Sequence, residues 1–268
     1  MDHLELEKEL KDNIKTLSRG LMQSDYSLAY RGYKNLYRLG HSALDTLVEK
    51  IYEIDWSHSK YKELSKYISG IFSLIHDIDE ETADSVRKRL TTDGCPKHIR
   101  ALLDSTCRFS VKNYFRYKVR GIDIFEHRKI KKKCNIQYHI ENWLSNIEEG
   151  DLADISRLYI IRKDDVVSWA GTYTPVIFKI TLLWDIPYKE GSILFKVSSL
   201  TTEQTLYHEL GHHAHRHNFK QDRSDKEREA DRYAYLMMRR THPILSIFAN
   251  AFSKLGMKSE RNYYRWGL

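Results

Sequence analysis

Apolar residues recur at intervals of three and four along the first hundred positions of the chain. Leu10, Ile14, Leu17 and Leu21 form the first such stripe, and similar stripes follow at 28–39, 44–54, 64–75, 79–90 and 96–109. In an α-helix this spacing places the apolar side chains on one face. The pattern predicts a helix-rich amino-terminal region, and no group of residues within it indicates a reaction.

The pattern changes after one further expected helix at 136–147. Short runs rich in β-branched and aromatic residues follow, separated by glycine or proline, at 158–161, 166–167, 176–184 and 193–197. Such runs are typical of β-strands. Two more helices are expected, at about 202–217 and 225–240. We therefore expect an α+β protein, with a helical region of unknown role at 1–135 and a second domain at 136–268.

Charge is concentrated in one part of the sequence. The 268-residue chain has a net charge of +7, and the window 87–133 alone holds 15 lysines and arginines against four acids. Aromatic residues lie among these cations, so the window is a candidate nucleic-acid contact. One hypothesis is a non-catalytic module that binds nucleic acid or protein through this window. Solvated helix faces would produce the same composition.

The sequence also bears on cellular location. Its three cysteines, Cys95, Cys107 and Cys134, are odd in number and far apart, which favours a reducing compartment over a disulfide framework. The amino terminus lacks the basic-then-apolar order of a secretory signal. The longest nearly apolar stretch, 243–252, is about half the roughly 20 residues that a membrane span requires. We expect a cytoplasmic protein that does not cross a membrane.

One short motif indicates specific chemistry. His208-Glu209-Leu210-Gly211-His212 is an HExxH sequence within an expected helix. Residues four apart on a helix differ by only about 40° of rotation, so His208 and His212 face the same way and can bind one ion. Glu209 stands beside them, close enough to act on a water without being a ligand. This is the arrangement of zinc peptidases, although a histidine-rich surface helix would contain the same letters.

A catalytic zinc needs a third protein ligand, and the next helix offers one. Glu227 and Asp231 share a face of that helix with two alanines, which would allow it to lie close to the motif helix. Glu227 is the favoured ligand, and Asp231 could accept a hydrogen bond from a ligand histidine. Two alternatives stay open at this point. Ser224 and Glu227 have the spacing of a capping box, and His217 could replace Glu227 as the ligand.

These two segments resemble the gluzincin metallopeptidases, most closely the ImmA/IrrE family. The resemblance rests on HELGH at 208–212 and EREADRYAYLMM at 227–238, about 40 residues of the chain. It implies a zincin-like unit with a small, mostly antiparallel sheet and an active-site helix. It further implies a cytoplasmic zinc peptidase that cuts a specific protein, in this family often a DNA-bound repressor.

The expected function is therefore zinc-dependent hydrolysis of a peptide bond in an intracellular protein. Zinc on His208, His212 and Glu227 would activate a water, and Glu209 would serve as the general base. The run 193–197, read as a strand, is a candidate edge for pairing with an extended substrate. Candidate donors to the oxyanion are side chains near the motif: Tyr207, His213 and Tyr233.

Overall fold

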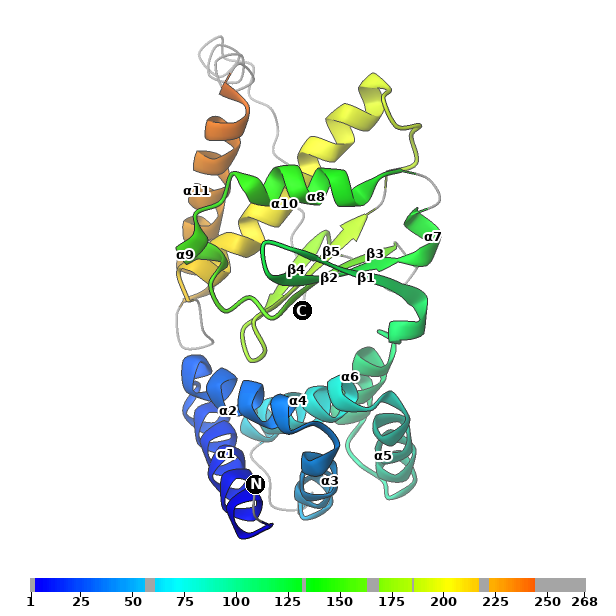
Figure 1. Ribbon diagram of the computed structural model, residues 1–268, viewed down its shortest axis with the longest axis vertical. Helices are drawn as coiled ribbons and strands as arrows, with labels where there is room; N and C mark the ends of the chain where they lie inside the picture. Colours follow the sequence, from blue (N-terminus) through cyan, green and yellow to red (C-terminus); the bar gives the residue numbers. More distant parts are fainter. Residues whose placement is uncertain are drawn as a thin grey trace. The chain divides into compact units, whose positions relative to one another are not determined.

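The computed structural model describes residues 3–55, 61–131, 134–162, 169–184, 186–216 and 222–243. The chain divides into two compact units, Met1–Asn113 and Tyr114–Leu268. The described part of the first unit is helical, and the second unit combines helices with one five-stranded sheet (Figure 1). The expectation of an α+β protein is confirmed at this level.

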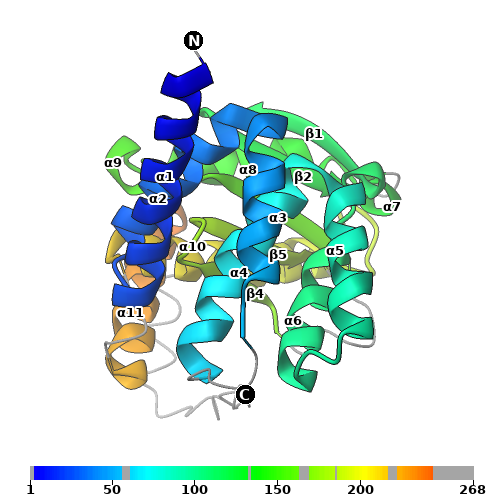
Figure 2. The same ribbon diagram turned by 90° about the horizontal axis from the view of Figure 1, so that it is seen from below.

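The amino-terminal unit is built around helix α4. Its elements are α1 (His3–Gln23), α2 (Tyr26–Leu39), η1 (Gly40–Ala43), α3 (Leu44–Tyr52), α4 (Tyr61–Ile78), α5 (Glu80–Thr92), α6 (Lys97–Cys107) and η2 (Val111–Asn113). Helix α4 contacts the other five α-helices, and Ile68, Ile71 and Ile75 on it are fully buried. Leu17 and Leu21 of the predicted α1 stripe are fully buried as well, and α1 and α2 lie side by side (Figure 2). Periodic apolar burial therefore accounts for this unit.

The carboxy-terminal unit contains the sheet. Its elements are β1 (Tyr114–Val119), β2 (Ile122–His127), α7 (Arg128–Lys131), α8 (Ile136–Ser145), α9 (Glu149–Leu152), β3 (Arg157–Arg162), β4 (Gly171–Thr174), β5 (Lys179–Trp184), α10 (Ile193–Ala214) and α11 (Arg223–Thr241). The strand order is β1-β2-β3-β5-β4. Pairs β1/β2 and β4/β5 are antiparallel, whereas β2/β3 and β3/β5 are parallel. The sheet is mixed rather than mostly antiparallel, because α8 carries the chain from β2 back to the start of a parallel β3.

One face of the sheet packs against α8 and α10 (Figure 1). Ile124, Ile160 and Leu182 come from neighbouring strands on this face, and Trp143 of α8 and Leu206 of α10 complete the same buried cluster. Strand β3 is buried along almost its whole length, as expected for a central parallel strand. This packing holds α10, which carries the HExxH motif, against the sheet.

The boundary between the two parts lies at 113/114 and not at 135/136. The sequence pattern places the stretch that follows 113 in the helical region, yet this stretch forms the hairpin β1/β2, which pairs with β3. Arg120 and Gly121, with φ of 48° and 82°, make the two-residue turn of this hairpin. Because β1 and β2 complete the sheet, they belong to the second unit.

A second difference concerns 193–197, which is not a strand. These residues form the first turns of α10, and the Ser192 side chain caps the helix by accepting a hydrogen bond from the Phe195 N–H at 3.1 Å. The run at 166–167 lies outside the described residues. Within the described parts of the chain, no helix is long and apolar enough to cross a membrane.

Candidate metal centre

Helices α10 and α11 lie close together because small residues face one another between them. A Cβ added at Gly211 would stand 2.9 Å from Ala230 Cα and 3.0 Å from Tyr233 Cβ, so only glycine fits there without a shift. Ala230 and Ala234 are almost completely buried. The close approach brings the acidic residues of α11 within reach of the histidines of α10.

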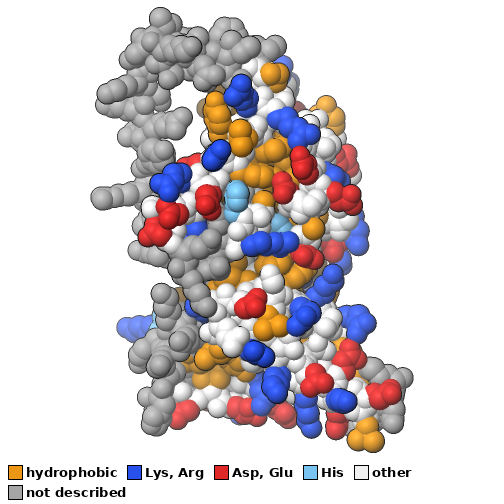
Figure 3. Space-filling model, turned by 90° about the vertical axis from the view of Figure 1, so that its left-hand side faces the viewer, with side chains coloured by type: hydrophobic (Ala, Val, Ile, Leu, Met, Phe, Trp, Pro, Cys, Tyr) orange, Lys and Arg blue, Asp and Glu red, His pale blue; other side chains and the backbone are white. Residues whose placement is uncertain are grey.

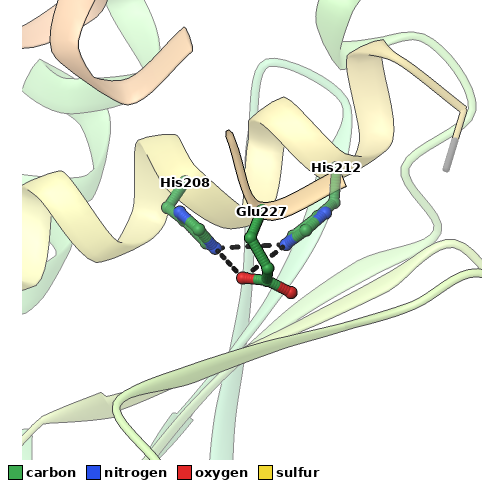
Figure 4. A group of neighbouring side chains, drawn as sticks. All are labelled: His208, His212 and Glu227. Carbon is green, nitrogen blue, oxygen red and sulfur yellow. Dashed lines mark hydrogen bonds and ion pairs between the residues drawn. The ribbon is translucent and has the colours of Figure 1, made fainter. Parts of the chain in front are cut away.

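His208, His212 and Glu227 converge on one point (Figure 4). The Nε2 atoms of the two histidines are 3.1 Å apart, and Glu227 Oε2 is 3.3 Å from His208 Nε2 and 3.9 Å from His212 Nε2. Ligands about 2.0–2.1 Å from a tetrahedral zinc ion are about 3.3 Å from one another, so this spacing suits zinc. Among the described residues, no other group of three histidine, cysteine or acidic side chains converges in this way.

The group lies at the protein surface. The side chains of His208 and His212 are 21% and 13% exposed, and that of Glu227 is 45% exposed. The space-filling view shows histidine side chains reaching the surface among hydrophobic and acidic ones (Figure 3). An ion held here would therefore keep a side open to water and to a substrate, as a catalytic zinc requires.

Asp231 is hydrogen-bonded to His208, the histidine that lies nearer to Glu227. Its Oδ1 accepts a hydrogen bond from His208 Nδ1–H at 3.0 Å, which leaves His208 Nε2 free to face the group. Burial alone would lower the pKa of His208, but Glu227 and the nearby carboxylates raise it. The hydrogen bond from His208 lowers the pKa of Glu227 in turn. The site is therefore arranged for one positive charge among carboxylates, and a bound cation would take the place of the proton on His208.

The capping alternative for Glu227 does not describe the start of α11. The Asp222 carboxylate caps this helix and accepts a hydrogen bond from the Ser224 N–H at 2.8 Å. The Glu227 side chain is thereby left to point at the histidines rather than back along its own helix. His217, the alternative third ligand, lies outside the described residues.

No family model, curated protein or solved structure matches the chain. The chemistry assigned to this site therefore rests on the kinds of donor atom present and on their spacing.

Glu209 lies on the side of α10 that faces strand β4, next to the side that carries His208 and His212. It is only 7% exposed, and burial raises the pKa of its carboxyl to about 7, against the opposing effects of His208 and a hydrogen bond from the Tyr173 backbone N–H. A Cβ added at Gly171 of β4 would stand 3.0 Å from Glu209 Oε1. An edge strand therefore runs directly beside the carboxylate. Strand β4 is not among the strands expected from the sequence, although Gly171 and the Thr-Tyr-Thr run before Pro175 are a signal for it.

The three side chains considered as oxyanion donors are all hydrogen-bonded inside the protein. Tyr207 is fully buried and donates to Glu203 Oε1 at 2.8 Å. His213 is 1% exposed, and both of its ring nitrogens have partners. The Tyr233 hydroxyl donates to Asp151 Oδ2 at 2.7 Å. Tyr207 and His213 are therefore too deeply buried to reach a substrate.

The basic window 87–133 is divided between the two units. Helices α5 and α6 carry its first part, and β1, β2 and α7 carry its second part. Several of its cations have local partners: Arg87 binds Asp84 and Asp104, and Arg116 binds Asp123. These pairs neutralise part of the charge that made the window a candidate nucleic-acid contact.

Proposed function

We propose that this chain is a zinc-dependent endopeptidase of the gluzincin type, similar to the ImmA/IrrE family, and that its carboxy-terminal unit is zincin-like. The observation that supports this most directly is the convergence of His208, His212 and Glu227, with Glu209 beside them. Two imidazoles and one carboxylate are the ligand set of several zinc peptidases. Asp231 would hold His208 in the correct orientation.

The residues around the ion would have different roles in the reaction. Zinc held at this site would act as a Lewis acid and would lower the pKa of the water bound to it towards about 7. Glu209 takes a proton from the attacking water on a carboxylate oxygen and returns it to the leaving amine. Its burial suits this exchange, because in the metal-free chain its pKa is raised to about 7. A nearby cation would lower that pKa and favour the basic form.

Strand β4 is the proposed binding site for an extended substrate. It is the last strand of the sheet, with β5 on one side, and it lies beside Glu209. A peptide that pairs with the outer edge of β4 would be held by backbone hydrogen bonds next to the carboxylate. This role replaces the one expected for 193–197.

The proposal includes a protein substrate, of which a DNA-bound regulator is the family precedent, and a cytoplasmic setting. Cys95, Cys107 and Cys134 form no disulfide. Burial raises the pKa of Cys95 and raises that of Cys107 to about 11. Cysteines that form no disulfide suit a reducing compartment.

Metal analysis combined with cleavage assays tests the proposal. Wild type should hold one zinc per chain and cleave a mixed peptide library read by mass spectrometry. Glu209→Gln should retain zinc and lose about 10²- to 10⁴-fold in rate. Glu227→Ala should lose zinc, whereas the control Glu229→Ala, an exposed neighbour on α11, should keep both zinc and activity. If Glu209→Gln cleaves as fast as wild type, or wild type cleaves nothing, the proposal is wrong.

A further inference from the structure

One row of side chains on α10 lies along strand β4. Thr205, Glu209 and His213 are each four residues apart, so they lie in one row along the helix. Gly171 lies against Thr205 and Glu209, and Tyr173 lies against His213. Four helical residues advance about 6.0 Å and two strand residues about 6.6 Å, so the two repeats stay in register over this length.

His213 lies at the end of this row, and its ring is completely enclosed. It is 1% exposed, and it stands edge-on to Tyr173 and Phe178 with ring centroids 5.5 and 5.2 Å away. Its Nε2–H donates to the Ala153 carbonyl at 2.8 Å. Because a carbonyl only accepts, Nε2 carries a proton. In the neutral imidazole Nδ1 is then the acceptor, and it receives the Tyr173 hydroxyl at 3.0 Å.

Tyr173 thereby ties β4 to this end of the row. Its hydroxyl is bound to His213, and Gly171, two residues earlier on the same strand, lies against the Glu209 carboxylate. The edge strand therefore links the side chain after the second histidine of the motif to the glutamate within the motif. Ala153, which ends α9, fixes the far side of the His213 ring.

We propose that His213 is a positioning residue that sets the place of β4, and through β4 the place of the Glu209 carboxylate. This inference rests on the proposed function for its catalytic consequence. In this role His213 contacts neither zinc nor substrate. A histidine that faces away from the ion would thus decide how well the general base is aligned.

Three substitutions separate the two hydrogen bonds of the ring. His213→Gln places an amide near the position of Nε2 and keeps a donor to Ala153, but removes the acceptor for Tyr173. His213→Asn places its carbonyl near the position of Nδ1 and keeps that acceptor. Tyr173→Phe removes only the hydroxyl. The control is His215→Gln, the same replacement at the exposed end of α10.

The direct readout is hydrogen exchange of the Tyr173 backbone amide in the full-length protein. His213→Gln and Tyr173→Phe should speed this exchange about tenfold, because one hydrogen bond that fixes β4 is lost. His213→Asn and His215→Gln should leave it near the wild-type rate. The double variant should match either single variant, because both remove the same bond. Unchanged exchange in His213→Gln would overturn the inference whatever the enzyme does.

The catalytic readout is the split between kcat and KM in the zinc-loaded protein. His213→Gln should lower kcat about tenfold while zinc content and KM stay the same, since alignment affects the general base more than binding. Faster exchange with unchanged kcat would limit His213 to a structural role and overturn the positioning claim. Absence of Glu209-dependent cleavage in wild type would instead overturn the proposed function. The hydrogen-exchange result does not depend on cleavage, so it distinguishes failure of the proposed function from failure of the inference about His213.

Discussion

Two helix pairs, one in each unit, use glycine in the same way. A Cβ at Gly32 of α2 would stand 2.6 Å from the backbone nitrogen of Leu17 on α1. A Cβ at Gly211 of α10 would stand 2.9 Å from Ala230 Cα on α11. In both pairs the absence of a side chain brings the two backbones closer than ordinary side-chain packing allows.

The two pairs differ in what they enclose. Between α1 and α2 the close approach buries apolar side chains completely: Leu17, Leu21, Ala29 and Leu36. Between α10 and α11 it gathers ring nitrogens and carboxylates around one point at the surface. Burial of apolar surface stabilises the first pair directly. The second pair holds polar groups whose desolvation and mutual repulsion a cation would offset, so the same packing would serve the proposed metal binding there.

Zinc should produce the largest difference between the two pairs. At a free concentration 1,000 times its dissociation constant, a ligand of the folded state alone stabilises it by about 4 kcal/mol. Amide hydrogen exchange in α10 and α11 should therefore slow strongly when zinc is added to chelator-treated protein, whereas exchange in α1, α2 and α4 should not change. Equal protection of both units, or of neither, would contradict the comparison.

Replacement of Gly32 or Gly211 by alanine should have a smaller effect than zinc binding. The two variants separate effects on stability from effects on metal binding. Forcing a methyl group into a tight contact costs about 1–3 kcal/mol. Gly32→Ala should lower the stability of the amino-terminal unit and leave zinc affinity unchanged. Gly211→Ala should lower both the stability of its own unit and zinc affinity, because α11 must move away with Glu227. Denaturant unfolding and zinc titration measure the two effects.

Gly150→Ala provides the matched control for both variants. Gly150 lies in α9, and a Cβ there would meet nothing within 4 Å. Its replacement should leave stability and zinc affinity close to wild type. A loss of zinc affinity in Gly32→Ala as large as that in Gly211→Ala would remove the distinction between the two pairs.

The helices and the three-residue group could be anticipated because both depend on local periodicity. The α1 stripe is buried as expected, and spacing by four predicted that His208 and His212 share a face. The choice of Glu227 over its neighbours also followed from helical spacing, and the structure brings it to the two histidines.

The strands and the cap of α10 depended on contacts that the sequence does not display. In β1 the alternation of Phe115, Tyr117 and Val119 was obscured by the basic residues between them, so the hairpin went unrecognised. The run 193–197 has strand-like composition, but Ser192 starts a helix there. Strand propensity yields to such context readily. The pairing of β4 with the His213 row could not be predicted, because it joins residues 40 positions apart.

Substitution of Asp231 should have the smallest effect on zinc affinity that still distinguishes the α10/α11 pair from the α1/α2 pair. The hydrogen bond of Asp231 orients His208 without touching the ion, and loss of such a partner weakens metal affinity about 10- to 100-fold. Asp231→Ala should fall in this range, and Asp231→Asn should lose less because its amide oxygen still accepts from Nδ1–H. Asp225→Ala is the control, since this exposed acid of α11 pairs with Arg228 on the same helix. Zinc titration that ranks Asp225→Ala with Asp231→Ala would show that net acidity of α11, rather than orientation of His208, sets the affinity.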